Sequence, residues 1–138
     1  MNISTDVAWK SFMRNLAGTG SISVSGDKLT VSNTTVGSGN YAFNKKAVFV
    51  KAGETYTFSC MARRISGANG TSGSISIYYP TLTDNVNKVE INTPDWERYE
   101  LRYTIPFSAQ PTSTIQINIG ILGGCAGEFE MSNPLLTV

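Results

Sequence analysis

Residues 114–121, Thr-Ile-Gln-Ile-Asn-Ile-Gly-Ile, carry the clearest structural signal in the chain. Isoleucine occupies every second position, and the positions between the isoleucines hold threonine, glutamine, asparagine and glycine. Side chains of a β-strand alternate between the two faces of its sheet, so this spacing predicts a strand with one apolar and one polar face. Isoleucine is branched at Cβ, which also favours a strand over a helix.

The same alternation recurs along most of the chain after residue 20. The segments that show it are 22–24, 29–31, 55–63, 75–79, 99–105 and 129–138. Residues 47–50 predict a short buried strand, and residues 86–91 predict a strand with a bulge near Asn87 and Lys88. Turn-forming Gly, Pro and Asn separate these segments. Strands with one apolar face bury it against a second sheet, so we predict an all-β, antiparallel two-sheet β-sandwich of the jelly-roll type.

The length of 138 residues fits one domain, and we expect residues 1–138 to form it. Within it, residues 1–20 are expected to be an irregular N-terminal segment and residues 21–138 to be the sandwich. Residues 8–16 alone have helix-like spacing, and Gly18 and Gly20 end it. We therefore expect a short helix or an irregular edge there.

The charge pattern excludes several partner classes. The net charge is +1, and the only adjacent basic residues are the pairs at 45–46 and 63–64. Nucleic-acid binders usually carry a basic stripe, so no nucleic acid is expected. The apolar runs are far too short to cross a bilayer, so no membrane partner is expected. The first residues lack the regions of a signal peptide, which leaves a cytosolic chain, a trimmed fragment or a part of a larger exported assembly.

A catalytic constellation is not expected. The chain contains no histidine, which removes the commonest general base and the usual zinc ligand. Two acidic pairs, Asp95 with Glu97 and Glu128 with Glu130, have the spacing that places both carboxylates on one strand face. We expect these carboxylates to be solvated or structural, and we predict that the protein is not an enzyme.

The two cysteines, Cys60 and Cys125, allow two interpretations. Both could be buried as small apolar side chains, since free cysteine is among the most buried residue types. A disulfide between an early and a late strand is the alternative, which spacing alone does not decide. A catalytic thiol or a metal site is not expected without a histidine.

Oxygen ligands near the C-terminus suggest a structural calcium site. Glu128, Glu130 and Asn133 offer carboxylate and amide oxygens, and Asn2 or Asp6 would join them if the terminal strands lie together. The alternative is that these residues are ordinary solvated side chains.

Three segments resemble a known family. They are Lys-Ala-Gly-Glu-Thr-Tyr-Thr-Phe-Ser at 51–59, Thr-Pro-Asp-Trp-Glu-Arg-Tyr-Glu-Leu-Arg-Tyr-Thr-Ile-Pro at 93–106, and Gly-Glu-Phe-Glu-Met-Ser-Asn-Pro-Leu-Leu at 127–136. Together they resemble jelly-roll carbohydrate-binding modules of the cellulose- and xylan-binding type, within the galactose-binding-like folds. The resemblance covers roughly residues 20 to 138. One departure is the Ser-Asn-Pro at 132–134, where family members often carry an aspartate, and it argues against the family's structural calcium.

The resemblance implies a non-catalytic module that binds a polysaccharide or a cell-surface glycan. Such modules occur in secreted polysaccharide-degrading enzymes and in phage tail and fibre proteins, so a virion or extracellular location is expected. A homo-oligomer or membership of a larger assembly would fit this setting. The alternative is a structural virion domain that makes protein contacts without binding a glycan.

Alternation also selects candidate ligand-binding residues. Tyr78 has the parity of Ser74 and Ser76 and is predicted to point outward, as are Arg63, Gln116 and Asn118. An exposed ring beside amide and guanidinium groups suits the apolar faces and hydroxyls of a sugar. We therefore predict that Tyr78, Arg63, Gln116 and Asn118 line a shallow polar groove with Tyr41 or Trp96 at its rim. The alternatives are a solvated sheet face and, for Trp96, a packing role.

Overall fold

The structure is a computed structural model, and it describes residues 10–14, 20–25, 28–33, 40–44, 48–67, 73–82, 84–121 and 127–138. These residues form strands and one short 3-10 helix. The strands are β1 (Lys10–Arg14), β2 (Gly20–Ser25), β3 (Lys28–Asn33), β4 (Asn40–Asn44), β5 (Val48–Phe49), β6 (Thr55–Ser66), β7 (Ser74–Tyr79), β8 (Asp84–Glu90), β9 (Glu97–Thr104), β10 (Thr114–Ile121) and β11 (Gly127–Thr137), and the 3-10 helix is η1 (Pro80–Leu82).

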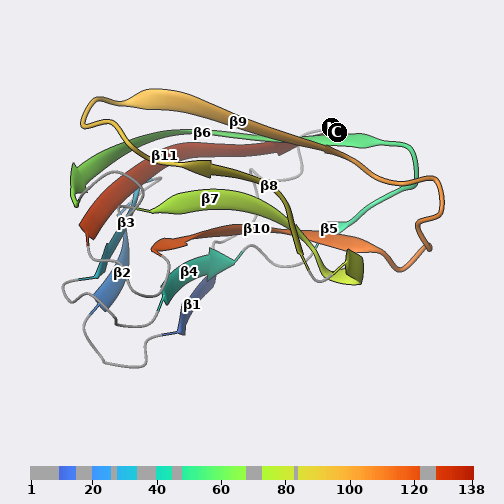
Figure 1. Cartoon of the computed structure of the whole chain (residues 1–138), viewed down its shortest axis with the longest axis horizontal. Helices are drawn as coiled ribbons and strands as arrows, with labels where there is room; N and C mark the ends of the chain where they lie inside the picture. The colour runs from blue at the N-terminus through green and yellow to red at the C-terminus, as the bar shows by residue number, and fades with distance from the viewer. Residues whose placement is uncertain are drawn as a thin grey trace.

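The strands form two antiparallel sheets. In one, here called the β10 sheet, the order is β1-β4-β10-β7-β8, and β5 also pairs with β10. In the other, the β11 sheet, the order is β2-β3-β11-β6-β9. The two sheets lie as layers along the long axis of the molecule (Figure 1). The predicted antiparallel two-sheet β-sandwich of the jelly-roll type is confirmed.

The core lies between the inner faces of the two sheets. Ile115, Ile117 and Ile119 of β10 are at most 1% exposed, and they face the same side as Ile75 and Ile77 of β7. The β11 sheet contributes a second apolar layer, in which Phe58, Leu101, Phe129 and Leu136 are buried. Each fully buried aliphatic side chain of this size contributes about 1.5–3 kcal/mol relative to an exposed one. The alternation of isoleucine and polar residues in 114–121 therefore determines which face of β10 packs against the core.

The N-terminal segment differs from the expectation of a helix or an irregular edge. Lys10–Arg14 form strand β1, which pairs along its length with β4, and β4 pairs with β10 at Ala42 and Tyr41. Neither strand was predicted, since β1 shows helix-like spacing and β4 follows a polar loop. A neighbouring strand supplies main-chain hydrogen bonds whatever the side-chain pattern, so pairing overrides the weak local preference.

A pinned turn closes one end of the sandwich. Gly53 has a φ of 79°, which glycine adopts without strain, and its N–H donates to the Ile105 carbonyl at 2.9 Å. The buried Tyr56 hydroxyl donates to a Glu54 carboxylate oxygen at 3.1 Å and accepts from the Lys51 N–H at 3.3 Å. Burial is the main reason that the pKa of Tyr56 lies above its ordinary value. The turn at residues 51–54 is therefore held at several points.

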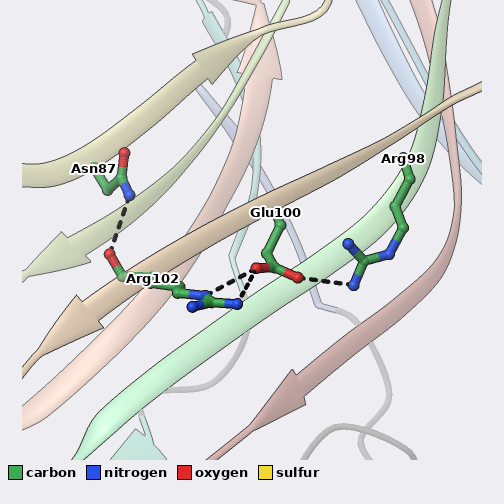
Figure 2. Close-up of polar contacts among 4 residues, drawn as sticks. All are labelled: Asn87, Arg98, Glu100 and Arg102. Atoms are coloured by element: carbon green, nitrogen blue, oxygen red, sulfur yellow. Dashed lines mark hydrogen bonds and ion pairs between the residues drawn. The ribbon is translucent and has the colours of Figure 1, made fainter.

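The bulge predicted near Asn87 and Lys88 lies one residue away. Ile77 pairs with Asn87 and Tyr78 pairs with Asn85, so Val86 is the extra residue. Asn87 has the inward parity of Ile77, and its side-chain amide donates to the Arg102 carbonyl at 3.0 Å (Figure 2). Since β8 is an edge of one sheet and β9 an edge of the other, this bond joins the two sheets.

No helix in the described ranges has the length and hydropathy that a bilayer crossing requires.

Candidate functional site

A strip of polar residues follows β7 and β10 on the outer face of the β10 sheet. Tyr78 pairs with Gln116 and Ser76 with Asn118, while the pair of Ile77 and Ile117 between them points into the core. Directly opposed residues of an antiparallel pair lie on the same face, so Tyr78, Gln116 and Asn118 share the outer face. The structure thus brings together three of the residues predicted from alternation.

One part of the strip is shielded from solvent. Ser74 and Ser76 have outward positions but are only 7% and 5% exposed, whereas Tyr78 and Gln116 are partly exposed. Asn118 Oδ1 is also buried, and no described residue donates a hydrogen bond to it. An unsatisfied buried acceptor costs free energy.

Phe49 adds an exposed aromatic ring to this face. It pairs with Thr114, whose outward parity is that of Gln116, and it is 72% exposed. Its diagonal neighbour on β10 is Gln116, a separation that an aromatic side chain spans. The expectation that residues 47–50 form a buried strand is wrong for Phe49, whereas Val50 is buried. The run Ala-Val-Phe-Val has no alternation, so only the pairing with β10 shows which side Phe49 faces.

The strip carries no charge excess of either sign. Lys88 and Glu90 of β8 lie opposite Ser76 and Ser74, so one cation and one anion flank its shielded part. Such a surface suits a neutral ligand with hydroxyl groups and apolar faces better than a phosphate or a sulfate.

Comparison with known proteins identifies the family of this sandwich. A family model described as a carbohydrate binding domain matches residues 9–126. The chain belongs to this carbohydrate-binding domain family. Membership of this family implies that the partner of the domain is a polysaccharide. Domains of this kind are usually secreted or extracellular. No curated protein matches the sequence.

Solved structures share the fold of this carbohydrate-binding domain at low sequence identity. A CBM4 structure is 19% identical with a TM-score of 0.65, over 94% of this chain and 85% of that one. The module BiXyn10A CBM1 is 14% identical with a TM-score of 0.65, over 100% of this chain and 95% of that one. A domain of tailspike protein 4 from bacteriophage CBA120 is 16% identical with a TM-score of 0.61, over 93% of this chain and 19% of that one.

Two other predicted site residues lie on the opposite side of the domain. Arg63 belongs to β6 of the β11 sheet, where its Nη2 donates to Glu130 Oε1 at 2.9 Å and its Cζ lies 5.0 Å from the centre of the Trp96 ring. The single groove expected from the sequence is therefore divided between two sheets. Alternation shows that a side chain points outward but does not show which sheet its strand joins. Tyr41 belongs to β4 of the β10 sheet, and its side chain lies outside the described part of the structure.

Glu130, one of the residues predicted to bind calcium, is already paired with two basic side chains. Glu130 is only 4% exposed, and two basic side chains neutralise it. Arg63 donates a hydrogen bond to Oε1. Lys28 Nζ lies 2.9 Å from Oε2 and forms an ion pair, but its geometry is not that of a hydrogen bond. Burial raises the pKa of Glu130, but the two cations lower it by more, so it lies below the ordinary value of a glutamate.

Glu128 lies two residues before Glu130 on β11, with a register irregularity between Glu128 and Phe129. Asn133 is exposed at an irregular stretch of β11 between Ser132 and Leu135, with a φ of 51°. No three acidic, cysteine or histidine side chains cluster within the ranges that the structure describes. Asn2 and Asp6 lie outside those ranges.

Cys60 is a buried free thiol on the inner face of β6. Burial raises the pKa of Cys60 to about 12, so the thiol is not ionised at neutral pH. This agrees with its role as a small apolar side chain, while Cys125 lies outside the described residues.

Proposed function

We propose that this domain binds a neutral polysaccharide through the strip on β7 and β10, and that it does so without catalysis. The observation that carries the proposal is the placing of Phe49 and Tyr78 beside the amides of Gln116 and Asn118 on one outer face. Aromatic rings cover the apolar faces of sugar rings, and side-chain amides donate to and accept from sugar hydroxyls.

The number of contacts favours weak binding at a single strip. A stacked ring contributes about 0.5–1.5 kcal/mol by analogy with aromatic pairs, and a net hydrogen bond contributes about 0.5–1.5 kcal/mol. Part of this gain is lost to ordering the ligand and the exposed side chains. Display of several copies on one particle would raise the effective affinity.

The absence of catalysis rests on the residues available at the strip. Hydrolysis of a glycosidic bond usually needs two carboxylates across a cleft. Of the two acidic residues on β8, Glu90 pairs with Ser74 of the strip, whereas Asp84 pairs with Tyr79, which is not a strip residue. The sequence contains no histidine that would act as a general base instead.

The setting that we propose is a phage tail or fibre, or another cell-surface glycan-binding protein, with a virion or extracellular location. The tailspike likeness supports it, since this chain corresponds to 19% of the tailspike chain and so has the size of one module in a larger protein. Attachment to a host glycan would then be the purpose of the binding.

The proposal is tested by a glycan array followed by titration calorimetry with cellohexaose, xylohexaose and the best array ligand. Replacing Tyr78 by alanine should weaken binding by about two- to tenfold, because one stacked ring is lost. Gln116→Ala should have a similar effect through its hydrogen bonds.

Thr57→Ala is the matched control, since Thr57 is a partly exposed outward residue at the centre of the opposite sheet. It should leave the affinity unchanged. Wild-type affinity in both Tyr78→Ala and Gln116→Ala would remove the strip as the site, and an array without any bound glycan would reject the function.

A structural assembly domain is the second candidate. Phe107 is 90% exposed and Leu82 is 55% exposed, and a contact between copies would remove these apolar side chains from water. If these residues form a contact between copies, light scattering should show an oligomer, and Phe107→Ser should convert it into a monomer. A monomeric wild-type protein at high concentration would argue against self-assembly.

A further inference from the structure

A cavity of about 330 Å³ opens at one end of the sandwich, away from the centre of the strip. It lies between η1, which follows β7, and the loop at residues 106–113, which leads into β10. Small-molecule sites usually have volumes of about 300–1,000 Å³, so this end pocket has room for a small ligand.

The described residues that line the end pocket combine apolar and neutral polar side chains. Pro80, Leu82, Pro106 and Ala109 present apolar surface. The other described side chains that line the pocket carry hydroxyl or amide groups, and none of them is charged. This combination matches a neutral ring that has apolar faces and hydroxyls at its edge.

Two buried hydroxyls face each other at the pocket. Tyr79 is 2% exposed and Ser113 is 6% exposed, and the Tyr79 hydroxyl lies 3.5 Å from Ser113 Oγ. That distance is long for a bond between hydroxyls, which normally measures about 2.7–2.8 Å. A hydroxyl also has one donor and two acceptor sites, so this contact does not use the full hydrogen-bonding capacity of either group.

The loop that forms the pocket is held by its own main-chain bonds. The Ala109 N–H donates to the Pro106 carbonyl at 3.0 Å, and the Ser113 N–H donates to the Gln110 carbonyl at 2.9 Å. The Ser113 carbonyl accepts from Val50 at 3.0 Å, which ties the loop to the residue after β5. Because the loop is already ordered, binding of a ligand costs little conformational entropy.

We infer that the end pocket is a second carbohydrate site, which takes one neutral sugar ring at the end of a glycan chain. This inference rests on the proposed function and extends it, since the strip would hold the middle of a chain and the pocket its end. Thr114 lines the pocket and pairs with Phe49 of the strip, so the two sites are neighbours on β10.

The test is a titration of the isotope-labelled protein, followed through its backbone amide resonances. The probes are the methyl glycosides of glucose, xylose, galactose and mannose. At least one glycoside should shift the backbone amide resonances of Thr81, Gln110 and Ser113, and the shifts should reach a plateau as the glycoside concentration rises. Gln110 is exposed, so Gln110→Ala should keep the fold and weaken this binding by about two- to tenfold. Gln116→Ala, the matched change in the strip, should leave it unchanged.

The outcomes separate the two proposals. Glycosides that leave residues 80–82 and 106–114 unmoved overturn the end pocket, and hexasaccharide shifts at Tyr78, Gln116 and Asn118 then still support the strip. If the amides of the end pocket shift while those of the strip do not, the end pocket is supported as a sugar site and the strip is rejected as one. Pocket affinity that is unchanged in both Gln110→Ala and Ser113→Ala also overturns the inference.

Discussion

Glu130 shows how one buried charge is accommodated in the β11 sheet. A carboxylate that is almost fully buried loses hydration, a cost that proteins offset with ion pairs and hydrogen bonds. Here Arg63 and Lys28 supply both, and each keeps part of its own side chain in water. Arg63 in turn covers the Trp96 ring, so one cluster links β3, β6, β11 and the turn before β9.

The lowered pKa of Glu130 makes a prediction about pH. Because the folded pKa lies below the unfolded value of about 4.3, the charge stabilises the fold above that value, and this stability is lost as the pH falls through the folded pKa. Glu130→Gln should lower the free energy of unfolding by about 1–3 kcal/mol at neutral pH. Urea unfolding at pH 7 and at pH 3 should show a smaller gap between wild type and variant at pH 3. An equal gap at both values would contradict this account.

Two features of the edge strands β8 and β9 limit their pairing with strands of another chain. Glu100 accepts hydrogen bonds from Arg98 and Arg102 on the same exposed face of β9, at 2.9 and 2.8 Å (Figure 2). The bond with Arg98 and then that with Arg102 lower the pKa of Glu100 below its ordinary value. Such charged residues on an edge strand discourage pairing with another chain. The second feature is the bond from Asn87 to the Arg102 carbonyl.

The hydrogen bond from the Asn87 side chain on β8 to the Arg102 carbonyl on β9 should contribute measurably to stability. Asn87→Ala should lower the free energy of unfolding by about 0.5–1.5 kcal/mol, the usual net worth of one hydrogen bond. Amide exchange should accelerate in β8 and in the facing part of β9. Lys88→Ala is the control, because Lys88 is exposed and points outward, and it should change stability by at most about 0.5 kcal/mol. Equal effects of the two changes would show that the bond contributes nothing.

At the scale of the whole molecule, the sequence predicts the layers better than the site. Alternation at residues 114–121 identifies the inner face of β10, because burial of isoleucine dominates the energetics there. The same alternation marks Arg63 and Gln116 alike as outward, although they lie on opposite sheets. Sheet membership depends on pairing between distant segments, which no local pattern encodes. Phe49 was missed for that reason, and so was the end pocket, whose walls come from η1 and from the distant loop at residues 106–113.

The charge distribution leads to a prediction about salt. The net charge is +1, Lys88 and Glu90 balance each other beside the strip, and none of the described residues that line the end pocket is charged. Stacking and neutral hydrogen bonds are not screened by ions, whereas attraction between exposed charges is largely screened beyond about 8–10 Å at physiological salt.

Binding of a neutral hexasaccharide should therefore change by less than about twofold between roughly 0.05 and 0.5 M NaCl, as measured by titration calorimetry. Polygalacturonate, an acidic polysaccharide, is the comparison ligand, since the part of its affinity that comes from surface lysines and arginines should fall steeply with salt. If the neutral ligand lost affinity by about tenfold over this range, charged groups outside the strip would have to carry the recognition. A ligand whose affinity survives high salt, and is weakened by Tyr78→Ala, would instead match the uncharged aromatic surface of the strip.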